Sequence, residues 1–181
     1  ARALSEDEMR RAFARNWSTD WHLYRDIFLY CRSKSIPMIG LNVPRSITRK
    51  VSRNGFEALT PEEIGKLPPI VCRVDREYEA FLRRVLGDHG TDSGFRRFCE
   101  AQLVWDTALA IYTLEYLEKH PERTVVVLCG MIHAWRKAAP EQATRQNASV
   151  AQVVVQPSVS GRCTPESVSE ADADYLIFGL G

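Results

Sequence analysis

The sequence predicts an α/β domain with a mostly parallel sheet that helices flank on both faces. Helical patterns alternate along the chain with short apolar runs of strand length, as in folds built from strand–helix–strand units. The apolar runs are continuous rather than alternating, which is typical of parallel strands buried on both faces. The chain has 181 residues and no internal repeat, so we expect a single domain over residues 1–181.

The helices are expected from capping signals and apolar spacing. Ser5, followed three residues later by Glu8, forms a capping box for a helix over 5–14. A second helix over 18–34 has apolar residues at three- and four-residue steps. Further helices are expected over 43–53, from Thr60 to before Pro68, over 75–87 and from about Asp92 to about Lys119. A loop is expected over 87–90. The last helix is expected to begin at about Ile132 and to be interrupted at Pro140.

Four apolar runs have the composition of strands. The clearest covers 124–129, which is β-branched, uncharged and ended by Gly130. The others cover 36–41, 150–156 and 175–180. With the helices between them, these four runs would supply the predicted sheet.

Composition and missing motifs narrow the classes of function. The formal net charge of +1 provides no general attraction to nucleic acid, and no apolar run is long enough to span a membrane as a helix. The five cysteines contain no Cys-x-x-Cys pair, so a structural zinc site is not expected. Nucleophile-elbow, Walker and dinucleotide glycine motifs are also missing, which favours a binding protein over an enzyme.

Ligands of open α/β sheets bind beyond the carboxyl ends of parallel strands. That rule selects the segments 41–45 and 129–133, each of which carries polar side chains just after an apolar run. His133 is the leading candidate, because Gly130 allows a sharp turn and the imidazole could ligate iron or bind a carboxylate. The alternative is that His133 only caps the helix that follows.

Asp106 is the second candidate, because it is the only charged residue between Ala101 and Leu114. A helix that is apolar on nearly all sides is buried, and a buried carboxylate is costly unless it has a partner. Gln102 lies one turn earlier on the same face and could share the hydrogen-bond network. The alternative is a purely structural ion pair or a loop cap.

A basic stripe is expected on the helix over 43–53. Arg45, Arg49 and Arg53 are spaced by four residues and therefore share one face. The stripe could face an anion, with Arg45 nearest the strand end, or it could be the solvated face opposite Ile47 and Val51. For Arg49 and Arg53 the solvated face is the better interpretation.

Three segments together resemble the ChaN-like haem-binding lipoproteins of the wider group of Tiki- and TraB-like proteins. They are Ile36–Arg45 with its Asn-x-Pro-Arg turn, Gln102–Ala110, which is similar to a Gln-x-x-Arg-Asp-x-x-Met-Ala helix, and Val125–Ala134, which is similar to a strand that ends in Gly-x-x-His. Asp174-Tyr175 before the last strand also fits the pattern.

The resemblance implies a function and a set of site residues. It implies a haem-binding protein of the bacterial cell envelope, in the periplasm or the outer membrane, that is linked to iron uptake and forms homodimers. Haem, or a similar flat anionic ligand, would be held by Asn42, Arg45, Gln102, Asp106 and His133. Contact with the membrane would come only through a lipid anchor, which this sequence does not carry.

The chain departs from the family pattern at two points. Trp105 stands where the family has Arg, and no strand with a Gly-Glu-x-x-His motif precedes the first helix. We therefore expect this chain to be the carboxy-terminal part of the family domain. A metal-dependent hydrolase, as in the Tiki-like group, is the alternative, and it requires several convergent ligands of which His133 and Asp106 are visible.

Overall fold

The computed structural model describes residues 4–87, 91–158 and 163–178. It consists of two compact units, one extending to Gly40 and the other starting at Leu41. Each unit has its own apolar core.

The first unit is a small helical cluster. Helix α1 (Glu6–Asn16) begins with the predicted capping box, in which the Ser5 hydroxyl accepts from the Glu8 backbone and the Glu8 carboxylate accepts from the Ser5 backbone. A 3₁₀ turn, η1 (Trp21–Leu23), and helix α2 (Arg25–Ser33) follow. The core residues of this unit are Met9, Phe13 and Trp21, with Phe28 and Leu29 packed against them.

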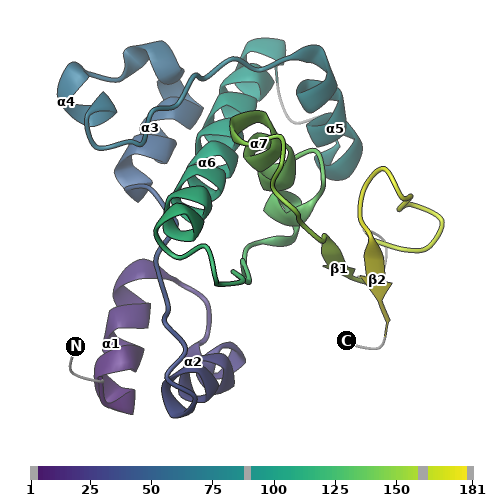
Figure 1. The fold of residues 1–181 in the computed structure, drawn as a ribbon. Helices are drawn as coiled ribbons and strands as arrows, with labels where there is room; N and C mark the ends of the chain where they lie inside the picture. The colour runs from purple at the N-terminus through teal and green to yellow at the C-terminus, as the bar shows by residue number, and fades with distance from the viewer. Residues whose placement is uncertain (1–3, 88–90, 159–162, 179–181) are drawn as a thin grey trace. The chain divides into compact units, whose positions relative to one another are not determined.

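The second unit is organised around one long helix, α6 (Asp92–Lys119), as Figure 1 shows. Its bounds agree with the prediction, and Thr91 caps its first turn through the Gly94 backbone. The other elements of the unit are α3 (Arg45–Asn54), η2 (Phe56–Ala58), α4 (Pro61–Ile64), α5 (Arg76–Leu86), η3 (Met131–Ala134) and α7 (Ala139–Gln146).

Helix α3 packs on α6 through the apolar face opposite its arginines. Ile47 and Val51 are buried, whereas Arg45, Arg49 and Arg53 are all exposed, so the basic stripe is on the exposed side of the helix. The helix ends at Gly55, whose φ of 87° strongly favours glycine. The Glu100 carboxylate of α6 accepts a hydrogen bond from the Phe56 backbone at 2.9 Å, which ties this turn to the long helix.

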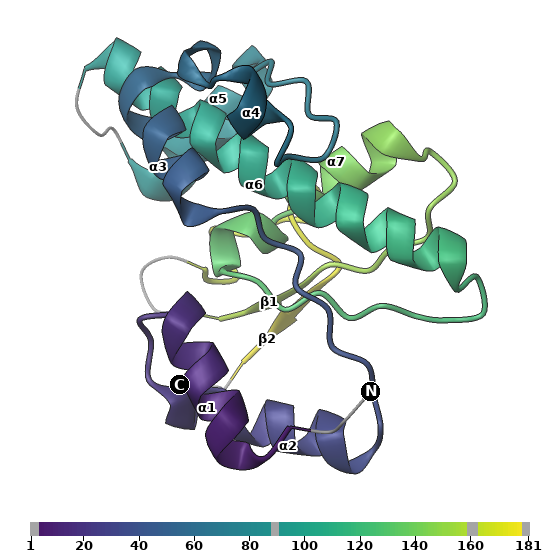
Figure 2. The ribbon, with the colours of Figure 1, turned by 90° about the vertical axis from the view of Figure 1, so that its left-hand side faces the viewer.

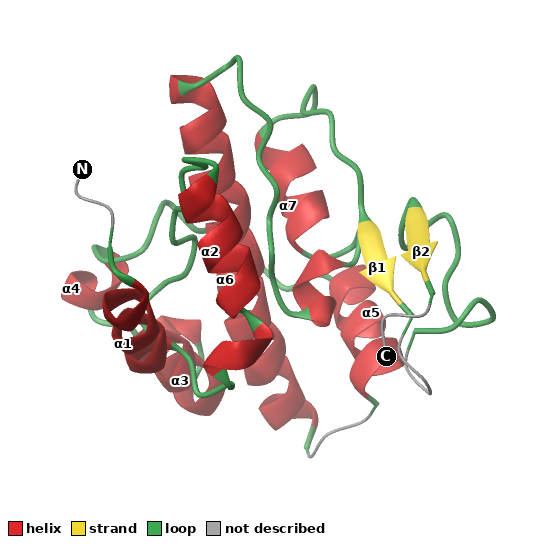
Figure 3. Ribbon diagram, turned by 90° about the horizontal axis from the view of Figure 1, so that it is seen from below, coloured by secondary structure: helices red, strands yellow, loops and turns green. Residues whose placement is uncertain are grey.

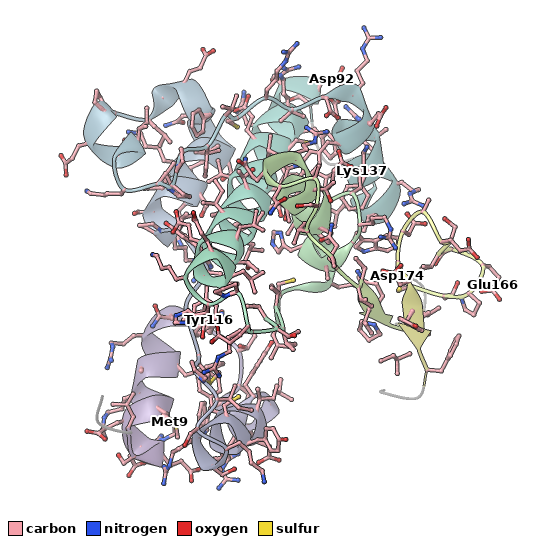
Figure 4. The ribbon with its side chains drawn as sticks, viewed as in Figure 1. Met9, Asp92, Tyr116, Lys137, Glu166 and Asp174 are labelled. Atoms are coloured by element: carbon pink, nitrogen blue, oxygen red, sulfur yellow. The ribbon has the colours of Figure 1, made fainter. Side chains whose placement is uncertain are left out.

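Helices α5 and α7 pack near α6 around the main apolar core. Its largest buried side chains are Tyr78, Phe81, Leu82, Phe95 and Trp135. Lys137, which Figure 4 labels just ahead of α7, pairs with Glu77 of α5 and Glu141 of α7. These ion pairs tie the starts of the two helices together at the surface.

The described sheet has two parallel strands, β1 (Val155–Pro157) and β2 (Tyr175–Ile177), which lie side by side in Figures 2 and 3. Val155 pairs with Tyr175, and Pro157 pairs with Ile177. Asp174, labelled beside these strands in Figure 4, accepts from the Val154 backbone and pairs with Arg136. The predicted strand over 150–156 overlaps β1 only at Val155 and Gln156, whereas β2 is the first part of the strand predicted over 175–180.

The predicted strand over 124–129 is wrong. This segment has no strand assignment in the described structure, and its side chains are not buried: Val126 is 78% exposed and Leu128 is 64% exposed. A β-branched run favours extended backbone, but a strand also needs a neighbouring backbone to pair with. Across the described part of the chain, no backbone–backbone hydrogen bond involves residues 124–129.

The predicted strand over 36–41 is wrong for the same reason. It has no strand assignment, and Ile36, Met38 and Ile39 are exposed. The expected sheet with helices on both faces is thus not found among the described residues, which form a mostly helical structure with a two-stranded parallel sheet. Continuous apolar runs cannot reveal whether partner strands are available.

Smaller differences concern helix ends. The helix expected over 18–34 is divided into η1 and α2, and Pro140 lies in the first turn of α7, where its missing N–H costs nothing. The helix predicted over 43–53 is α3, which begins two residues later, at Arg45, with Pro44 in the cap position. Residues 88–90 of the predicted loop and residues 179–180 of the last predicted strand lie outside the described residues.

Candidate functional site

Asp106 lies at the centre of the candidate site, in the middle of α6. Its side chain is 0% exposed, as the apolar surroundings of this helix predicted. An isolated carboxylate at such a position would be strongly destabilising, so its partners decide what the site is.

Two side chains from outside α6 supply those partners. The Tyr78 hydroxyl of α5 donates to Asp106 Oδ2 at 2.5 Å. The Nδ1 atom of His133, in η3, lies 2.7 Å from Asp106 Oδ1. Each carboxylate oxygen therefore has its own partner, and the structure brings together the two strongest candidates from the sequence, Asp106 and His133.

Burial dominates the electrostatics of this cluster. Removal from water raises the pKa of Asp106 above its usual value, and the hydrogen bonds from His133 and Tyr78 partly oppose that rise. Burial and the neighbouring Asp106 carboxylate raise the pKa of Tyr78 well above its usual value, so Tyr78 stays a neutral donor. Burial, followed by the charge of Asp106, raises the pKa of Cys129 to about 11, so this thiol stays protonated at neutral pH.

The His133 side chain remains partly accessible, with 17% of its surface exposed. The edge of its ring meets Trp105, with the ring centroids 5.5 Å apart and the planes at 80°. Because Nδ1 faces Asp106, Nε2 is the ring nitrogen left for another ligand. A Cβ atom at Gly130 would lie 3.7 Å from the imidazole, which is an ordinary van der Waals contact, so the position of the ring does not require a glycine there.

Trp105 links His133 to the other predicted strand end. It packs in a cluster with Val43 of the segment before α3, and the indole Nε1 is buried without a hydrogen-bond partner among the described residues. The position at which the family pattern has Arg therefore presents an aromatic surface with one unsatisfied donor.

The remaining predicted site residues occupy different environments. Gln102 is buried one turn before Asp106, but no hydrogen bond joins the two side chains among the described residues, so the expected shared network is not present. Asn42 is exposed, and its Oδ1 accepts from the Val43 backbone. Arg45 is exposed at the first residue of α3.

Tyr78 is the member of the cluster that the sequence did not reveal. It lies in an ordinary amphipathic pattern, and its hydroxyl meets Asp106 only because α5 packs near the middle of α6. The available signal was indirect: a carboxylate in an apolar helix requires donors, and tyrosine is one of the few side chains that can provide one from a core.

Comparison with known families decides the relationship of this chain. Residues 1–142 match the family described as haem-binding uptake, Tiki superfamily, ChaN. The chain belongs to this ChaN family. The match covers α1 to α7 up to Gln142, and therefore includes Tyr78, Asp106 and His133, whereas β1 and β2 follow the matched residues. No curated protein and no solved structure matches the sequence.

The residues of the cluster are chemically suited to the haem that the name of the ChaN family implies. An imidazole nitrogen, an aromatic surface and a buried unpartnered N–H lie together at His133 and Trp105. Two hollows, of about 510 Å³ beside β2 and about 410 Å³ beside α7, do not include His133. A ligand at His133 would therefore lie outside these two hollows. No helix of the described chain is long and apolar enough to cross a membrane.

Proposed function

We propose that this chain binds haem at His133 and serves in bacterial haem or iron uptake. The observation that carries the proposal is the contact between His133 Nδ1 and the fully buried Asp106 carboxylate, which leaves Nε2 free of that contact on a side chain that is 17% exposed. Histidines that ligate metals generally donate their other ring N–H to a carboxylate or a carbonyl, which fixes the tautomer and strengthens the ligand. In this proposal Nε2 binds the haem iron or a propionate.

Each part of the cluster has a distinct role in this proposal. Asp106 orients the imidazole, and Tyr78 holds the second carboxylate oxygen so that the carboxylate cannot rotate away. Trp105 supplies an aromatic ring beside the imidazole. When bound, haem supplies the iron, and the protein residues provide only ligation, orientation and an apolar surface.

The charge of Arg45, at the start of α3, suits the negative charge of haem. Arg45 is exposed and lies two residues after Val43, which belongs to the apolar cluster against which Trp105 packs. Arg45 is also one of the residues that the family resemblance selected. We propose that it pairs with a haem propionate, and that Asn42 and Gln102 contribute polar contacts around it. A homodimer and a location in the bacterial cell envelope are further parts of the proposal that rest on the family alone.

The test is a haemin titration followed at the Soret band. The chain, His133→Ala and the control His22→Ala would be compared; His22 is exposed and lies in the first unit. We expect a saturable, shifted Soret band whose Kd rises at least about 10-fold in His133→Ala and stays unchanged in His22→Ala. Asp106→Asn should also weaken binding by about 10-fold, because the imidazole loses its charged partner.

Two outcomes would contradict the proposal in different ways. A saturable shift of equal strength in the chain and in His133→Ala would place haem elsewhere on the molecule. No saturable change in any variant, with circular dichroism showing folded protein, would refute haem binding by this chain. The hydrolase alternative would then be tested by zinc titration, although the described residues contain no group of three or more His, Cys, Asp or Glu placed to hold a metal.

A further inference from the structure

A second candidate site lies in a hollow of about 410 Å³ that three segments of the second unit form together. Val71, Arg73 and Asp75 come from the extended segment before α5, whereas Leu103 and Thr107 come from α6. Helix α7 closes the hollow with Gln142, Arg145 and Gln146. Tyr78, Asp106 and His133 do not line it, so it is distinct from the proposed haem site. Its volume is at the small end of the range for small-molecule sites.

Two buried polar atoms in the lining lack a hydrogen-bond partner among the described residues. They are the hydroxyl of Thr107, a residue that is 3% exposed, and the amide nitrogen of Gln142, a residue that is 6% exposed. A buried polar atom without a partner costs about 1–3 kcal/mol. A helical threonine commonly bonds the carbonyl four residues earlier, yet Thr107 does not do so. Both atoms belong to residues that line the hollow, so a polar ligand that reached them would supply the missing partners.

The charges around the hollow favour an anion. Arg145 is held by Asp75 at 2.6 Å and by Glu141 at 2.5 Å, so its charge is already balanced. Arg73 is exposed, and it has no ion pair within the part of the chain that the structure describes. Arg73 is therefore the cation of the lining that is available to a ligand.

The rim of the hollow is fixed before any ligand arrives. Asp75 uses one carboxylate oxygen to cap α5 at the Tyr78 backbone, at 2.8 Å, and uses the other to hold Arg145. The Arg145 guanidinium is thereby held at the end of α7, next to Gln142 in the lining. Such preorganisation reduces the entropy that a ligand loses on binding.

We propose that this hollow binds a small aliphatic carboxylate. Its carboxylate pairs with Arg73 and accepts hydrogen bonds from Gln142 Nε2 and the Thr107 hydroxyl, while its hydrocarbon part lies against Leu103 and Val71. One ligand then satisfies both unpartnered donors and the unpaired guanidinium. The proposal does not depend on haem, because the two sets of residues do not overlap.

The test uses butyrate as the probe and butyramide, its neutral isostere, as the matched ligand. Binding would be followed by two-dimensional NMR of the full chain, observing the side-chain NH₂ group of Gln142. The titration would extend to about 50 mM, well above the millimolar Kd expected for so small a ligand. We expect saturable shifts of the Gln142 signals with butyrate and at least about 10-fold weaker binding of butyramide.

Variants separate a specific site from general attraction to positive charge. Arg73→Gln should weaken butyrate binding at least about 5-fold, whereas Arg49→Gln, which removes an exposed arginine from α3, should leave it unchanged. Thr107→Val, which removes the unpartnered hydroxyl at nearly constant volume, should weaken binding without lowering the melting temperature of the free chain. Equal affinity for butyramide, wild-type affinity in Arg73→Gln, or no saturable shift would overturn the proposal.

Discussion

The hydrogen bond from Tyr78 to Asp106 provides the most direct test of the buried cluster. Tyr78→Phe removes only the hydroxyl and leaves Asp106 Oδ2 without its donor in a site that is 0% exposed. Hydrogen bonds to charged groups contribute about 1.5–3 kcal/mol, and the ring keeps its packing against Phe81. We therefore expect the free energy of unfolding to fall by about 1.5–3 kcal/mol, which corresponds to a melting temperature lower by about 3–12 °C for a chain of this size.

Thermal unfolding by circular dichroism would measure the loss, with Tyr112→Phe as the matched control. Tyr112 is a half-buried residue of α6 whose hydroxyl makes no hydrogen bond within the described residues, so this change should shift stability by less than about 0.5 kcal/mol. A Tyr78→Phe variant as stable as Tyr112→Phe would refute the reasoning.

The pH dependence of the loss tests the charge state of Asp106. Burial raises the pKa of this carboxyl, so its ionisation reduces stability as the pH rises through the folded-state pKa. The Tyr78 hydroxyl opposes that penalty, because it stabilises the ionised form. The deficit of Tyr78→Phe should therefore be larger at neutral pH than at about pH 4, where a larger fraction of Asp106 is protonated. Equal deficits at both pH values would show that the hydrogen bond does not stabilise a carboxylate.

Two further predictions concern other parts of the second unit. Gly55→Ala should lower the free energy of unfolding in urea by about 1–3 kcal/mol, because φ is 87° and the new Cβ would lie 3.3 Å from Glu100 Oε2. The control Gly40→Ala, whose Cβ would meet nothing within 4 Å, should leave the free energy of unfolding unchanged. Burial alone would raise the pKa of Asp172, but the hydrogen bonds from Arg84 and Ser169 outweigh the effect of burial and lower the pKa below 3.8. The stability that the Asp172 carboxylate provides is therefore lost as the pH falls below that value. Asp172→Asn should reduce stability by about 1 kcal/mol at neutral pH and flatten the stability profile at acid pH; an unchanged profile would contradict this.

Local signals in the sequence predicted most of the helices correctly. The capping box at Ser5 and Glu8, the end of α3 close to residue 53 and the bounds of α6 follow from contacts within a few residues, and the structure shows each of them. The sheet was predicted less well, because a strand needs a partner that is distant in sequence. Residues 124–129 have strand composition, yet they have no backbone partner in the described chain.

The candidate site was predictable only as far as local signals in the sequence reach. A carboxylate in an apolar helix had to be buried and had to have a partner, and this pointed to Asp106 before any contact was known. The partner proposed from helical spacing was Gln102, but the structure shows Tyr78 and His133 instead. Spacing identifies neighbours within one helix, whereas hydrogen bonds between elements depend on how the helices pack.

The sequence by itself determined where the long helix runs, that Asp106 is buried within it, and that His133 follows a turn at Gly130, because each depends on local spacing or on the cost of burying charge. Only the tertiary structure decided that Asp106 joins Tyr78 to His133, and that Thr107, Gln142 and Arg73 meet around one hollow. Both arrangements join residues that are distant in the chain, and their geometry is set by the packing of α5, α6 and α7.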